Sequence, residues 1–166
     1  MTSALRALAA LMVLALAAPG IAHAQQAEVA FGGIKADTSL PVEVTADTLS
    51  VNQTDGTATF SGNVLVVQGG MRLSAERVEV VYGGTDRSRI ERLHASGQVT
   101  LVSGKDAAEA ADAVYTIDSG AVEMTGDVLL TQGASTIAGQ KLVVDLASGT
   151  GRMEGRVTTV LQPGGN

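Results

Sequence analysis

One pattern recurs four times along this chain and restricts its fold more than any other feature. A glycine follows two positions after an apolar or small residue, and further apolar residues come two and four positions after the glycine. The copies occupy residues 60–66, 95–101, 124–130 and 153–159, and the last ends in a threonine. Alternation with a period of two is typical of a β-strand with one buried face. The chain is therefore expected to be all-β and repetitive.

A second pattern lies between these strands. A small residue and a polar residue are followed by apolar residues two and four positions later, with Thr116 as the exception, at Ala46-Asp47, Ala75-Glu76, Ala111-Asp112 and Gly139-Gln140. The glycines at 62, 97, 126 and 155 are 35, 29 and 29 positions apart, and the polar markers are 29, 36 and 28 apart. Both markers indicate a repeat of about 30 residues. With turn signals between them, they predict about four two-strand units, or about eight long antiparallel strands.

The parity of the apolar residues changes at the small-polar pairs. Met71 and Leu73 are odd-numbered, whereas Val78 and Val80 are even-numbered. A one-residue offset exchanges the two faces of a strand, so a bulge or corner is expected at each pair. Long strands bent at regular corners predict a jellyroll-like sandwich or an open barrel. Residues 105–113 have a helix-forming composition, for which we expect one helical turn at most.

The first 24 residues have the features of a cleaved secretory signal peptide. A basic start is followed by an apolar run from 7 to 18 and by Ala22-His23-Ala24, a small-residue cleavage site. Residues 25–40 are expected to be a flexible lead-in, 41–161 the β-domain and 162–166 a short tail. The run is shorter than the roughly 20 residues that span a bilayer. This organisation predicts an exported, periplasmic protein.

Composition excludes several classes of function. A formal net charge of −6 argues against nucleic-acid binding, and the absence of cysteine excludes disulfides. Only His94 remains once the leader is removed, so no catalytic constellation, metal site of His and Cys, or cofactor site is recognisable. We therefore expect no enzyme. The corner carboxylates Asp47, Glu76 and Asp112 are open to two interpretations: a calcium-binding edge, or polar groups that satisfy bulge N–H groups.

The inward-facing side chains are the remaining candidate site. Aromatic residues are 2% of the chain, so its apolar content is mostly aliphatic and suits acyl chains better than rings. Periodicity alone is also consistent with an ordinary core. The predicted lipid-binding set is Phe60, Val64, Val66, Val78, Val80, Val99, Leu101, Val114, Met124, Val128, Leu130, Leu142, Val144, Met153 and Val157.

Several segments resemble the OstA-like family of periplasmic lipopolysaccharide-transport bridge proteins. The resemblance is carried by residues 41–47 (PVEVTAD), 59–64 (TFSGNV), 75–78 and 156–161 (RVTTVL), and it extends over nearly all of the chain after the leader. It implies an OstA-like β-jellyroll, open at both ends, that shields the acyl chains of lipid A in lipopolysaccharide. It also implies an LptC-like inner-membrane partner, an LptD-like outer-membrane translocon and head-to-tail self-association.

The edges of such a sheet are the expected partner interfaces. Val42 and Val44 mark the N-terminal edge, and Thr158 and Val160 mark the C-terminal edge, because open strands of different molecules pair by β-augmentation. Two alternatives stay open. One is a membrane-anchored LptC-like component that retains its N-terminal segment, and the other is a structural β-repeat envelope protein with a filled core.

Overall fold

The computed structural model describes residues 27–29, 34–84, 86 and 88–162, and this part of the chain consists of strands and connections without a helix. The strands are β1 (Ala27–Val29), β2 (Glu43–Thr45), β3 (Thr48–Asn52), β4 (Thr57–Gln68), β5 (Met71–Gly83), β6 (Arg89–Ser103), β7 (Asp106–Thr116), β8 (Ala121–Gln132), β9 (Ser135–Asp145), β10 (Thr150–Glu154) and β11 (Thr158–Val160). They form one antiparallel sheet in the order β1-β10-β9-β8-β7-β6-β5-β4-β2, with β3 on β4 and β11 on β9. The predicted all-β class is confirmed.

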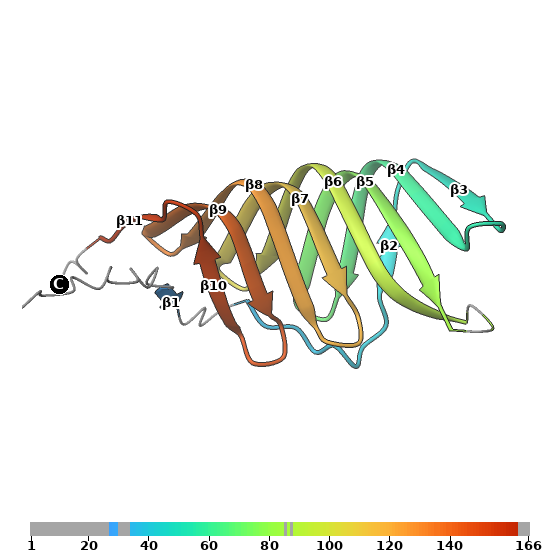
Figure 1. The fold of residues 1–166 in the computed structure, drawn as a ribbon, viewed down its shortest axis with the longest axis horizontal. Coiled ribbons are helices and arrows are strands. Elements are labelled where there is room, and N and C mark those ends of the chain that lie inside the picture. The colour runs from blue at the N-terminus through green and yellow to red at the C-terminus, as the bar shows by residue number, and fades with distance from the viewer. Residues whose placement is uncertain (1–26, 30–33, 85, 87, 163–166) are drawn as a thin grey trace, which may run out of the picture.

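The sheet folds over on itself because every long strand bends in its middle. In Figure 1 the bends form a row of arches along one side, and the hairpin turns line the opposite side. β2 with β3, and β10 with β11, are also bent strands, since each pair lies along the two halves of a single neighbour. We call the layer with β3 and β10 layer one, and the layer with β2 and β11 layer two.

Each bend is built from a glycine and its successor in the left-handed region. Gly62 and Asn63 have φ of 82° and 45°, and Gly97 and Gln98 have 80° and 45°. The register to the neighbouring strand shifts by one residue at these places, as in a β-bulge. The extra residue lies in the glycine strand, and the small-polar pair predicted as the bulge lies opposite it.

The third repeat corrects one detail of the sequence analysis. The residue facing Gly126 is Ala111, because a Cβ placed on Gly126 would lie 2.7 Å from the Ala111 Cβ. The corresponding pair is therefore Ala110-Ala111, one position earlier than predicted. Ala113 and Tyr115 consequently point inward, and Val114 points outward opposite His94. The prediction that Val114 faces the interior was wrong.

Two further segments differ from expectation. Residues 106–113, where one helical turn at most was expected, belong to strand β7 and pair with β6 and β8. Ile34–Leu40 lie in the segment expected as a flexible lead-in, yet they make specific contacts along the molecule. The predicted signal peptide and most of the tail lie outside the described residues, so their boundaries remain predictions.

Candidate lipid-binding interior

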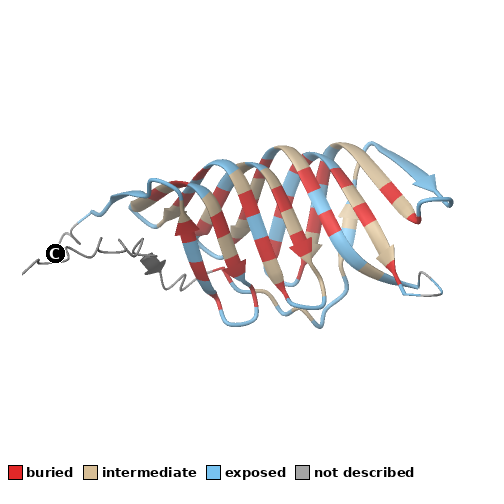
Figure 2. Cartoon of the chain, viewed as in Figure 1, coloured by how far each residue is buried: buried red, intermediate tan, exposed pale blue. Residues whose placement is uncertain are grey.

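The two layers enclose a continuous aliphatic interior that runs the length of the molecule. Twelve of the predicted inward residues are buried, at 0–1% exposure, in one cluster: Val64, Val66, Val78, Val80, Val99, Leu101, Met124, Val128, Leu130, Leu142, Val144 and Met153. Figure 2 shows buried positions recurring along the long strands. Phe60 is half-buried against this cluster. Val157 is 38% exposed beyond the last bend, so the prediction that it faces inward was wrong.

The hairpin turns of the two layers lie along one side of the molecule (Figure 1), where no strand pairing of the described residues joins the layers, and we call this seam the mouth. On the opposite side the strands run continuously from one layer into the other (Figure 1). The inward rows of layer two change from apolar to polar at the mouth. Gln68, Ser103 and Gln132 each follow their bend glycine by six positions and continue the rows of buried valines and leucines.

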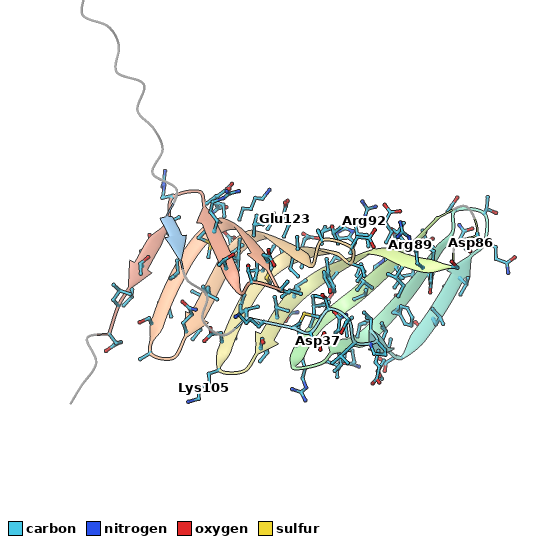
Figure 3. The ribbon with its side chains drawn as sticks, turned by 90° about the horizontal axis from the view of Figure 1, so that it is seen from below. Asp37, Asp86, Arg89, Arg92, Lys105 and Glu123 are labelled. Atoms are coloured by element: carbon cyan, nitrogen blue, oxygen red, sulfur yellow. The ribbon has the colours of Figure 1, made fainter. Side chains whose placement is uncertain are left out.

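Ile34–Leu40 run along this mouth between the turns of the two layers, and we call them the N-terminal strap. In Figure 1 this segment runs along the row of hairpin turns toward β2, and in Figure 3, seen from below, Asp37 lies midway along the molecule. The Ala36 N–H donates a hydrogen bond to the Leu146 carbonyl of layer one at 3.2 Å. The Ser103 hydroxyl of layer two donates to the Lys35 carbonyl at 2.8 Å. The strap is therefore attached to both layers.

Gln68 connects the strap to the interior. Its Nε2 donates to the carbonyls of Thr38 and Leu40 at 3.1 and 2.9 Å. Its Oε1 accepts a hydrogen bond from the Tyr115 hydroxyl of layer one at 2.6 Å. Both side chains are 1% exposed, and burial raises the pKa of Tyr115 while the bond to Gln68 opposes that shift. This Tyr115–Gln68 latch joins the two layers directly beneath the strap.

The strap also adds apolar contact to the interior. Ile34 is completely buried and belongs to the same cluster as the valines and leucines of the sheet. Ala36 packs against that cluster from a partly buried position. Sequence reasoning missed the strap, Gln68, Ser103 and Tyr115. The available signal was the polar residue at the sixth position after each of the first three bend glycines, where parity places it inside.

The interior is less well covered at the end formed by β3. Leu49 and Val51 pair with Phe60 and Ala58 on the inward rows, yet they are 57% and 62% exposed because no strand of the described residues lies beyond β3. A pocket of about 280 Å³ lies beside Val51 and Tyr82. This end therefore presents an apolar surface continuous with the interior.

The predicted edge residues lie on edge strands. Val42 and Val44 pack against the core from half-buried positions, and among the described strands β2 pairs only with β4. Thr158 and Val160 are exposed, and β11 likewise pairs only with β9 among these strands. In layer one, β10 is instead covered by β1, with Ala27 opposite Met153. Within the described part of the chain, β2, β3 and β11 thus have one edge without a neighbouring strand, where strand addition can occur.

The corner carboxylates stabilise the bends. The Asp47 carboxylate accepts a hydrogen bond from Asn63 Nδ2 at 2.8 Å, and the Glu76 carboxylate accepts one from Gln98 Nε2 at 2.9 Å. Both donors belong to left-handed residues that follow a bend glycine. The partners are side-chain amides and not the bulge N–H groups of the sequence-based interpretation. The Asp112 Oδ1 instead lies 3.4 Å from the Nε2 of exposed His94.

A bent antiparallel sheet with an aliphatic interior, a long mouth and open edge strands defines the class of β-jellyrolls. A comparison with solved structures agrees with this fold class. The structure of LptH, described as the LptA homologous periplasmic component of the lipopolysaccharide transport device of Pseudomonas aeruginosa, superposes with a TM-score of 0.68. The two chains are 20% identical over 77% of this chain and 99% of that one, which shows a common fold.

The sequence comparisons identify the family. Residues 43–150 match the model of the LptA/(LptD N-terminal domain) LPS transport protein family. An uncharacterized protein, R00383, of Rhizobium meliloti is 30% identical over 93% of this chain and 90% of its own length. The lipopolysaccharide export system protein LptA of Escherichia coli K12 is 29% identical over 78% of this chain and 75% of its own. The chain belongs to the LptA/LptD N-terminal domain family of lipopolysaccharide transport proteins, as the resemblance predicted.

Proposed function

We propose that this protein carries lipopolysaccharide across the periplasm by shielding its acyl chains in the interior between the two layers. The observation that carries the proposal is the unbroken aliphatic lining, which contains no charged side chain among its fully buried members and extends to the exposed Leu49 and Val51 of β3. Burying one methylene is worth about 0.8 kcal/mol, so an acyl chain of about 12 carbons costs on the order of 10 kcal/mol in water. A lined trough removes that cost without any chemical reaction.

The edge strands support a role as one link of a bridge. In the described part of the chain, β2 and β11 each have an edge without a neighbouring strand, at opposite ends of the sheet, and contact between unlike edges produces an open chain of molecules. The proposed partners are an LptC-like inner-membrane component, an LptD-like translocon and further copies of this chain. A Val44→Asp variant is expected to lose pull-down of an LptC-like jellyroll. Undiminished capture by a folded variant would contradict this assignment of the edge.

A photo-crosslinking experiment tests the carrier function. A photoreactive amino acid at Val66 or Val128 is expected to form adducts with lipopolysaccharide, because both residues are buried on inward rows. The same group at Leu65 or Leu129, one position away on the outer face, serves as the matched control and should give none. Adducts at neither inward position, with the protein folded and lipopolysaccharide in excess, would refute the proposal.

A second candidate is a structural β-repeat protein of the envelope. The almost complete burial of the interior side chains favours it, since the protein's own residues fill the space between the layers in this structure. The inward crosslinkers separate the two functions, because a permanently filled interior gives no lipid adduct at any position.

A further inference from the structure

The mouth is where a lipid with a large sugar headgroup must leave the interior. Acyl chains that lie between the layers require their polar headgroup to remain in water. The bend side is closed to it, because the six long strands β4 to β9 pass there from one layer to the other without a break (Figure 1). Whether a lipid enters sideways or through the β3 end, its headgroup must project through the mouth. The N-terminal strap lies across that path.

The strap also occupies part of the volume that a ligand would use. Ile34 is 0% exposed within the interior cluster, so its side chain takes the place of hydrocarbon between the layers. The Tyr115–Gln68 latch, which supports the strap from below, spans the gap between the layers at the same level. A bound acyl chain with its headgroup outside is therefore incompatible with this position of the strap.

The contacts of the strap are of a kind that can be released separately from the sheet. It forms no strand, and it is held by one hydrogen bond from Ala36, one from Ser103 and two from Gln68, all to carbonyl groups that water can reach once the strap has left. A segment outside the strand ladder can open locally at a free energy below that of global unfolding. The hydrogen bonds between the strands of the sheet do not involve the strap and remain when it leaves.

We propose that the N-terminal strap is a displaceable cover of the mouth that competes with acyl chains, so that lipopolysaccharide binds only when Ile34–Leu40 have left. This inference rests on the proposed carrier function and adds its regulation. A segment that must leave before binding lowers the apparent affinity by the fraction of molecules in which it has left. Locking the strap should therefore abolish binding, and weakening it should strengthen binding.

A disulfide provides the lock, since the chain contains no cysteine of its own. A Cβ placed on Gly69 would lie 3.9 Å from the Asp37 Cβ, within the range of disulfide-bonded cysteines. The full-length mature Asp37→Cys, Gly69→Cys double variant is titrated with fluorescent lipopolysaccharide, oxidised and then reduced. Binding is expected to fall by about tenfold or more on oxidation and to return on reduction. Each single variant, treated in the same way, controls for its substitution and for the oxidant.

The outcomes separate the strap from the carrier function. Equal binding by the oxidised and reduced double variant overturns the strap proposal while the carrier function stands. Absence of binding by every form, including the natural sequence, refutes the carrier function and the strap proposal with it.

A second variant tests the opposite direction. Ile34→Ala removes the buried side chain of the strap and is expected to tighten binding several-fold. The control is Leu129→Ala, which shortens an aliphatic side chain on the outer face of the sheet and should leave binding unchanged. Ile34→Ala that binds no better than Leu129→Ala would contradict the proposal.

Discussion

The Tyr115–Gln68 latch provides the most direct test of how the mouth is held together. Tyr115→Phe removes one hydroxyl and leaves the ring in place. Gln68 Oε1 then loses the donor 2.6 Å away, in a position where only 1% of the side chain is exposed. A buried acceptor without a partner costs about 1–3 kcal/mol. We expect the free energy of unfolding to fall by about 2 kcal/mol.

Urea denaturation followed by circular dichroism measures this change. With a denaturant slope of about 2 kcal/mol per molar, the midpoint should fall by about 1 M. Tyr82→Phe is the matched control, because Tyr82 is half-buried at the β3 end, beside Val51 and away from the latch; its midpoint should stay within about 0.3 M. A Tyr115→Phe midpoint equal to that of Tyr82→Phe would refute the reasoning, since it would mean that the latch contributes nothing to stability.

The same latch predicts a dependence on alkaline pH. Burial raises the pKa of Tyr115 above its ordinary value of 10.0, so the unfolded chain ionises at a lower pH than the folded one. The stability is therefore fully present below pH 10.0 and is lost as the pH rises through the pKa of the folded state. Unfolding midpoints measured at about pH 9 and about pH 11 should differ more in the natural protein than in Tyr115→Phe. An equal loss in both proteins would assign the effect to other groups.

Two further substitutions test the bends and the interior. Gly97→Ala should destabilise the fold by more than about 1 kcal/mol, because φ is 80° there and the new Cβ would lie 2.7 Å from a carboxylate oxygen of Glu76. Gly70→Ala is the control, because a Cβ at Gly70 would have nothing within 4 Å. Equal unfolding midpoints of the two variants would contradict this account. Leu130→Asp should reduce lipopolysaccharide retention, because it places a carboxylate on the inward row, whereas Leu129→Asp on the outer face should retain it. Unchanged lipopolysaccharide retention by a folded Leu130→Asp variant would contradict acyl-chain binding in the interior.

The bends could be predicted from the sequence because their causes are local. A left-handed backbone at Gly62 or Gly97 favours glycine, and alternation on either side of it requires a strand. Both signals lie within a few residues and recur at a regular interval. The pair β2 and β3 forms one bent strand, and so does the pair β10 and β11. Together with β4 to β9 they give the predicted eight long strands, and β1 is additional.

The error at Val114 has a physical reason. The residue opposite each bend glycine must fit at a short distance from that glycine. An alanine side chain fits there as well as a side chain that ends in a carboxylate. Ala111 fills this position, while neighbouring Asp112 bears the charge that the sequence pattern had taken as its marker. Alignment on polarity therefore shifted the third repeat by one residue, and a shift of one exchanges the two faces of a strand.

The hydrogen bonds of the strap could not be predicted because its own backbone groups form them. Lys35, Thr38 and Leu40 each accept hydrogen bonds through their carbonyl oxygens, which every residue carries. Their side chains show no periodicity that would reveal the path of the segment. The side chains that donate to them, Ser103 and Gln68, are about 70 and 30 positions away in the chain and are brought to the mouth only by the fold.

The balance between strap and ligand leads to a prediction about chain length. The strap contributes one buried isoleucine, worth about 1.5–3 kcal/mol, and four hydrogen bonds of about 1 kcal/mol each. At about 0.8 kcal/mol per methylene, a chain of roughly eight carbons balances these contacts, and longer chains should displace the strap.

An Ile34→Cys variant reports displacement, because the only thiol in the protein would be buried while the strap is in place. Alkylation of this thiol should accelerate when a single-chain glycolipid with an acyl chain of about 12 carbons is added, and a glycolipid with a chain of about four to six carbons should have no effect. A cysteine at Ser39, which is exposed in the strap, controls for direct effects of the lipid on the reagent. If long and short chains expose Cys at position 34 equally, the hydrocarbon does not compete with the strap, and some other event must open the mouth.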